Sequence, residues 1–209
     1  MASRFFGFFG RAVCHQLSER SFYIAGHKLA FCSRCLGIYL GFAACFALLA
    51  VLKRLAGNKP PSAAVNVFFA LCFAPMMFDA LSSAFGLRET NNALRFITGL
   101  LFGLPVPVYF VTLKNFSAEN PGGRAVIKPP EALCLLVWLP AAYFIVTRAD
   151  FPAAYYLVQT VAIGSLVLLF YSIARLVLSG LKRFRRAAAF ALALAVLSLM
   201  SVINHALTS

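Results

Sequence analysis

Acidic side chains are scarce in this sequence. Only 6 of its 209 residues are Asp or Glu, and charged residues of both signs make up 12% of the chain, about half the share usual in soluble proteins. Hydrophobic residues make up 62%, more than a soluble domain can hide from water. The composition therefore excludes an ordinary soluble domain and predicts a multi-pass membrane protein.

Familiar catalytic motifs are also missing. The sequence contains no glycine-rich nucleotide loop, no serine-hydrolase elbow and no HExxH zinc motif. Histidine occurs only 3 times, so the position of each histidine carries information. No short motif therefore names a reaction or a substrate.

The apolar runs are long enough to cross a bilayer, which takes roughly 20 helical residues. We predict an all-α fold, a polytopic membrane helix bundle embedded in the lipid bilayer. Its six transmembrane helices are expected at about residues 36–52, 63–85, 93–113, 131–147, 151–178 and 187–207. We expect residues 1–209 to form a single integral membrane domain, with residues 1–35 as an interfacial segment and residues 36–207 as the six-span bundle.

The 19 Lys and Arg residues give a formal net charge of +13. They fall between apolar runs, so we expect them to contact anionic lipid headgroups and not nucleic acid. Ten of them lie in the connections 1–2, 3–4 and 5–6, which predicts that these loops are cytoplasmic and both termini extracytoplasmic. Five basic residues in segment 1–35 oppose this orientation.

A cluster of soft metal ligands precedes the first span. Cys32 and Cys35 form a CxxC pair, and Cys14, His15 and His27 lie upstream. Thiolate and imidazole together suit a transition metal, zinc first, with the CxxC pair completed by two upstream ligands. Two other interpretations stay open: a redox-active or structural disulfide, and reduced thiols beside ordinary histidines.

Asp79 is the only acidic residue well inside an apolar run. A buried charge in a membrane normally faces the bundle interior and has a partner. Arg95 starts the next span on the same face, so we predict an Asp79–Arg95 pair below the cysteine cluster. The pair is either purely structural or part of a catalytic pocket, in which Asp79 relays protons or supports a metal.

Two GxxxG steps predict close packing between the first and third spans. Gly37 and Gly41 open the first span, and Gly99 and Gly103 lie in the third. Small residues four apart let two helix backbones approach closely.

These residues resemble an uncharacterised prokaryotic membrane protein family, domain of unknown function 2085. The resemblance is carried by Cys14-His15-Gln16, Glu19-Arg20-Ser21-Phe22, Gly26-His27, Cys32, Arg34-Cys35, Gly37, Tyr39, Gly41, Asp79 and Arg95-x-x-Thr98-Gly99. It covers the chain to about Gly103 and implies a prokaryotic inner-membrane location. It implies no activity.

Three function classes follow. The first is a metal-dependent membrane enzyme, which needs an open coordination position and a nearby acid. The second is a thiol-redox or structural accessory protein, which needs only the CxxC pair. The third is a transporter of a small solute or metal ion; few polar residues beyond Asp79 lead toward the cytoplasmic face, which counts against it.

Overall fold

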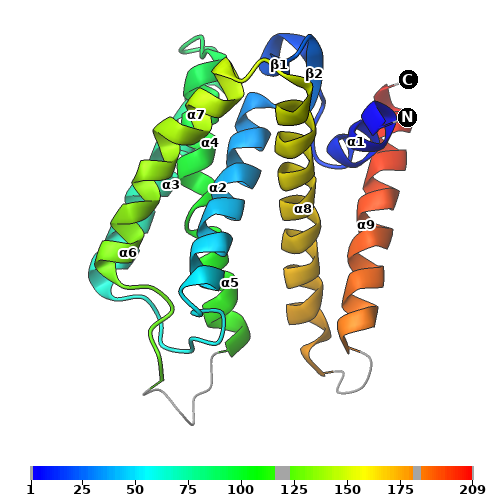
Figure 1. Ribbon diagram of the computed structural model, residues 1–209. Helices are drawn as coiled ribbons and strands as arrows, with labels where there is room; N and C mark the ends of the chain where they lie inside the picture. The colour runs from blue at the N-terminus through cyan, green and yellow to red at the C-terminus, as the bar shows by residue number, and fades with distance from the viewer. Residues whose placement is uncertain (1, 116–122, 181–184, 209) are drawn as a thin grey trace. The chain divides into compact units, whose positions relative to one another are not determined.

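The computed structural model describes residues 2–115, 123–180 and 185–208, and most of them are helical (Figure 1). This confirms the predicted all-α fold. The elements in chain order are α1 (Ala2–Arg11), η1 (Ser18–Arg20), β1 (Ser21–Ile24), β2 (His27–Cys32), α2 (Ser33–Val51), α3 (Ala63–Ala84), α4 (Asn92–Gly103), α5 (Val106–Asn115), α6 (Pro129–Cys134), η2 (Leu135–Val137), α7 (Trp138–Arg148), α8 (Pro152–Val177), η3 (Leu178–Gly180) and α9 (Arg185–Thr208).

Six helical segments within the described residues are long and apolar enough to cross a membrane, as the sequence predicts. The third segment consists of α4 and α5, and the fourth of α6, η2 and α7. Pro105 lies between α4 and α5, and because proline has no backbone N–H it interrupts the helical hydrogen-bond ladder there. The six segments are Ser33–Val51, Ala63–Ala84, Asn92–Asn115, Pro129–Arg148, Pro152–Val177 and Arg186–Leu207.

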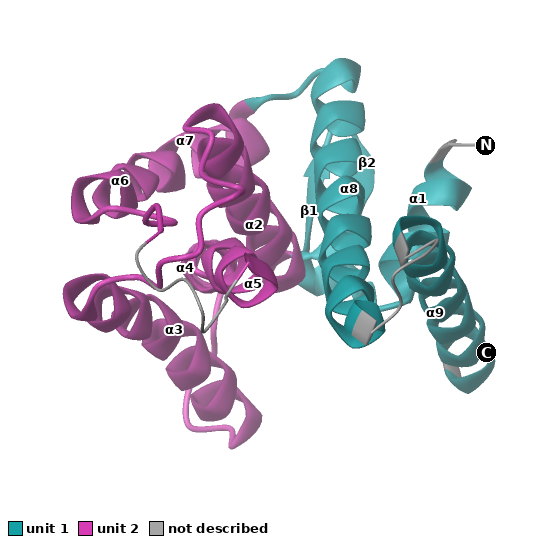
Figure 2. Cartoon of the chain, turned by 90° about the horizontal axis from the view of Figure 1, so that it is seen from below, with its two compact units in different colours: residues 1–32, 149–209 teal, residues 33–148 magenta. Residues whose placement is uncertain are grey.

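The chain divides into two compact units (Figure 2). Unit 1 consists of Met1–Cys32 and Ala149–Ser209, and unit 2 of Ser33–Arg148. The expectation that residues 1–209 form one integral membrane domain stays a prediction.

Unit 2 is organised around the close contact of α2 with α4. A Cβ atom added at Gly37 would meet the backbone carbonyl oxygen of Phe96, and one added at Gly41 would meet that of Leu100. From the other side, the α-carbon of Gly99 faces the carbonyl of Arg34 on α2. The predicted packing of the first and third spans through their glycines is therefore confirmed.

The hydrophobic core of unit 2 lies between α2, α3, the α4–α5 segment and the start of the fourth segment at α6 and η2. It contains Cys45, Leu49, Phe69, Leu104 and Val108, all fully buried. Cys45 thus has the role of a small hydrophobic residue, as expected for a cysteine inside an apolar span.

Unit 1 combines α8 and α9 with the N-terminal segment (Figure 1). Helix α1 lies against the C-terminal part of α9, where the Ser201 hydroxyl donates to the Phe8 carbonyl at 2.7 Å. The Asn204 side-chain amide donates to the Arg11 carbonyl, also at 2.7 Å. Both ends of the chain therefore lie at the same end of this unit.

A β-hairpin that the sequence analysis did not predict leads into α2. Strands β1 and β2 are antiparallel, and Ile24 pairs with His27 across a two-residue turn. Ala25 and Gly26 have positive φ angles of 51° and 73°, which is typical of a type I′ turn. The Ala25 N–H donates to the Asp150 carboxylate at 2.7 Å, which ties the turn to the residues before α8.

Candidate functional site

The hairpin brings Cys32 back to Cys14. Cys32 is the last residue of β2 and pairs with Ser21 at the start of β1, so the strand ends beside the segment that follows α1. The Cys32 N–H donates to the Cys14 sulfur at 3.2 Å. Two cysteines 18 positions apart in the sequence are thus adjacent in unit 1.

The Cys14 sulfur lies in a loop that folds around it. Cys14 is buried, with 3% of its surface exposed. The Gln16 N–H also donates to this sulfur, at 3.4 Å, and Gln16 has a positive φ angle of 54°. Two backbone N–H groups therefore point at the Cys14 sulfur, and such donors stabilise negative charge on an acceptor.

Cys35 completes a three-sulfur group. It lies in the first turn of α2, three residues after Cys32. The sulfurs of Cys14, Cys32 and Cys35 all lie within 4.8 Å of one another. Thiolates on one tetrahedral zinc ion are about 3.8 Å apart, because each zinc–sulfur bond is about 2.3 Å long. Small side-chain adjustments would therefore let all three bind one ion.

The two predicted histidine ligands are not members of this group within the described residues. His15 follows Cys14 directly but is exposed. His27 starts β2, and its ring contacts the Tyr155 ring on α8 with 5.4 Å between centroids. Their roles as metal ligands stay predictions.

Gln16 is a positioning residue to which sequence reasoning assigned no role. Its side-chain nitrogen donates to the Gly7 carbonyl on α1 at 2.8 Å and to the Ala30 carbonyl on β2 at 2.9 Å. It therefore ties the helix to the hairpin while its backbone N–H contacts Cys14. The only signal in the sequence was its place in the Cys-His-Gln motif.

Asp79 is buried in unit 2, with 1% of its side chain exposed, but its partners differ from the predicted one. The carboxylate accepts hydrogen bonds from Arg34 and, at 2.8 Å, from Arg88. Asp79 therefore pairs with two guanidinium groups where we expected Arg95. One carboxylate between two cations carries a local charge of +1, which fits a buried acid that stays ionised. The catalytic roles suggested for Asp79 and Arg95 stay predictions.

The order of the spans in the sequence contains a signal for the Arg34–Asp79 pair. Arg34 begins the first span and Asp79 is near the end of the second, so antiparallel spans bring both to the same face. Arg34 also lies between Cys32 and Cys35 in the sequence. The ion pair with Asp79 therefore anchors the turn of α2 that carries Cys35.

Comparison with known proteins covers about half of the chain. Residues 14–109 match the model of a family described as predicted membrane protein (DUF2085). An uncharacterised protein of Methanocaldococcus jannaschii is 39% identical over 101 residues, which are 48% of this chain and 63% of that protein. An uncharacterised protein of Methanothermobacter thermautotrophicus is 38% identical over 107 residues, 50% of this chain and 90% of that protein. No solved structure matches.

Proposed function

Because the chain belongs to the DUF2085 family of predicted membrane proteins, we propose that it is an integral membrane protein that binds a transition metal, zinc first, through Cys14, Cys32 and Cys35. The observation that carries this proposal is the convergence of the three sulfurs within 4.8 Å. Zinc favours thiolate ligands in tetrahedral geometry, and the buried Cys14 sulfur with its two N–H donors suits such a ligand.

Three cysteines leave one position of a tetrahedral ion for a fourth ligand. A histidine there would close the site and make it structural, whereas a bound water would leave it open for catalysis. His15 is the nearer candidate in sequence, because it follows Cys14 and its exposed side chain has room to turn. We favour the open site, and with it a metal-dependent membrane enzyme, because no imidazole joins the three sulfurs in the part of the chain that the structure describes.

Asp79 supports this function by position. Through Arg34 it holds the start of α2, and Cys35 occupies the next position of that helix. We propose that Asp79 keeps Cys35 in place and that Arg95 belongs to the same polar region of the enzyme.

Metal analysis of the purified full-length protein tests the proposal. Wild-type protein should retain about one zinc ion per chain, and the double variant Cys32→Ser/Cys35→Ser should retain almost none. Cys134→Ser is the matched control, because Cys134 is exposed on α6 and outside the sulfur group. Equal metal content in the double variant and the wild type would reject the proposal.

A thiol–disulfide function is the second candidate, because the same sulfur convergence favours it. Cys32 and Cys35 are both partly exposed and within reach of each other. Maleimide labelling with and without a reductant separates the two candidates. A redox pair should take up two more labels after reduction, whereas a metal site should gain labels after chelation.

We also propose that the protein lies in the cytoplasmic membrane of a prokaryotic cell with both termini outside. The basic loops between spans support this orientation. The contact of α1 with the C-terminal part of α9 supports only the placement of both termini on one side. An alkaline phosphatase fused after Ser209 should be active in cells. A fluorescent protein that folds only in the cytoplasm can be fused at the same point. Fluorescence from that fusion would indicate the opposite orientation.

A further inference from the structure

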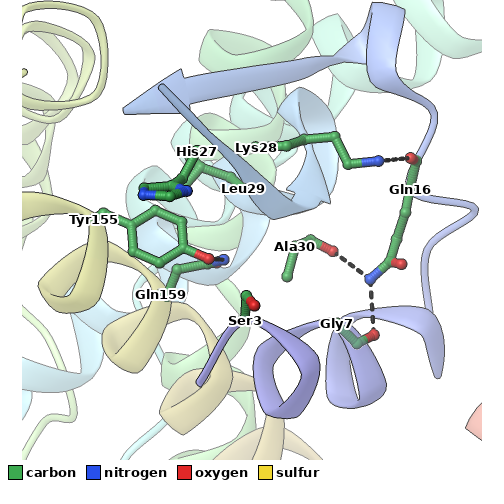
Figure 3. Close-up of a pocket in the computed structure, with 9 residues that line it drawn as sticks. All are labelled: Ser3, Gly7, Gln16, His27, Lys28, Leu29, Ala30, Tyr155 and Gln159. Carbon is green, nitrogen blue, oxygen red and sulfur yellow. Dashed lines mark hydrogen bonds between the residues drawn. The ribbon is translucent and has the colours of Figure 1, made fainter. Parts of the chain in front are cut away.

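Unit 1 contains a cavity of about 270 Å³ between α1, β2 and α8 (Figure 3). None of its lining residues is one of the three cysteines, so the cavity is separate from the proposed metal site. It is lined by Ser3, Gly7, Gln16, His27, Lys28, Leu29, Ala30, Tyr155 and Gln159.

The side-chain amide of Gln159 lacks a hydrogen-bond partner on one of its two terminal atoms. Gln159 is fully buried, and its Oε1 atom has no partner among the described residues. Its Nε2 atom is 3.5 Å from the Tyr155 hydroxyl (Figure 3). Turning the amide over would pair Oε1 with that hydroxyl and leave Nε2 unpaired. A buried polar group without a partner is costly, and the cavity is the place from which a ligand could supply one.

The rest of the lining combines two rings and two apolar side chains with the polar groups of Ser3, Gln16 and Lys28. The rings of His27 and Tyr155 lie 5.4 Å apart with 51° between their planes, beside the buried Leu29 and Ala30. The lining residues include no acidic side chain that would attract a cationic ligand. The ammonium group of Lys28 is engaged by the Gln16 carbonyl at 3.0 Å and by the Ser18 hydroxyl.

We propose that this cavity binds a single flat ring with hydroxyl or carbonyl oxygens, a phenol or quinone head group. A cavity of about 150 Å³ holds benzene in another protein, so this one has room for a substituted ring. A ring hydroxyl would donate to Gln159 Oε1. A ring carbonyl would accept from Nε2 after the amide turns over, while Tyr155 serves as donor or acceptor in each case.

The cavity is lined by residues of a membrane-spanning segment, which suits a ligand that dissolves in the bilayer. Tyr155 and Gln159 lie in the first two turns of α8, one of the six segments able to span a membrane. A lipid-soluble ring could therefore reach the cavity from the interface. The ligand would also contact Gln16, whose backbone N–H donates to Cys14.

The test measures binding of ubiquinone-1 and of its reduced quinol to the full-length protein in nanodiscs. The wild type should bind one or both saturably, and Gln159→Leu should weaken binding at least tenfold. Tyr155→Phe, which keeps the ring wall and removes only the hydroxyl, should weaken it less. Thr160→Val is the matched control, because Thr160 is the next residue on α8 and is exposed; it should bind like the wild type.

Two results would overturn the inference: no saturable binding of either probe by the wild type, or equal binding by Gln159→Leu and the wild type. Zinc content should be the same in Gln159→Leu and the wild type. Ring binding and zinc content are therefore independent measurements. Weaker ring binding by Gln159→Leu supports the cavity even if the protein binds no zinc, and zinc binding supports the metal site even if no ring binds.

Discussion

Replacing the buried Asp79 by asparagine should destabilise unit 2 more than removing either of its two arginines. The carboxylate is 1% exposed, whereas the side chains of Arg34 and Arg88 are 25% and 43% exposed. Breaking a fully buried ion pair costs about 3–5 kcal/mol. Both arginines in the Asp79→Asn variant can regain some water, so we expect the low end of that range, about 3 kcal/mol.

The two arginine variants should differ from each other. Arg88→Gln removes a partner that is nearly half exposed, so we expect a loss of about 1 kcal/mol or less. Arg34→Gln removes the more buried partner, which also begins α2, and should cost about 2 kcal/mol. Asp79→Asn should therefore have the largest effect and Arg88→Gln the smallest.

Thermal unfolding of the purified protein in detergent, followed by circular dichroism, would measure this order, with Arg95→Gln included for comparison. A double-mutant cycle between Asp79→Asn and Arg34→Gln would isolate the pair itself. The reasoning would be refuted if Arg88→Gln were as destabilising as Asp79→Asn. It would also be refuted if Arg95→Gln showed the coupling to Asp79 that we assign to Arg34.

Three further predictions concern single positions. Gln159→Leu should raise the stability of the ligand-free protein by about 1 kcal/mol, because it removes a buried amide oxygen that has no partner among the described residues; a loss of stability in the same unfolding assay would contradict this. Gly37→Ala should cost about 1–3 kcal/mol, because the new methyl group would meet the α4 backbone, whereas Gly164→Ala, where nothing lies within 4 Å of the added carbon, should be neutral or stabilising. Gly26→Ala should cost about 1 kcal/mol, because its φ of 73° strains any other residue, and hydrogen exchange should show faster opening of β1 and β2 only.

Much of the fold could be predicted because it follows from local composition. Each apolar run must form its backbone hydrogen bonds internally in a bilayer, so its length alone predicts a helix. The glycines at positions 37 and 99 also point to a specific contact, because few other residues allow backbones to come so close. The clustering of Cys14 with the CxxC pair was predictable for a similar reason, since few residue types bind soft metals.

Other features depended on contacts that sequence spacing does not reveal. The choice of Arg34 and Arg88 over Arg95 depends on how α2, α3 and the loop after α3 come together. The hairpin depends on a positive φ at Ala25, a residue that seldom adopts that conformation. The register of the hairpin places the His27 ring against Tyr155. The three sulfurs therefore come together without His27.

The sequence by itself determined that this is a six-span membrane protein with a soft-ligand motif before its first span, because hydrophobic length and ligand chemistry are local properties of the chain. Only the tertiary structure decided which cysteines come together, which arginines pair with Asp79, and that a cavity beside Tyr155 is lined by an amide oxygen without a partner among the described residues. Those outcomes depend on the directions in which side chains point between packed helices and strands. A single turn, glycine contact or strand register can change these directions.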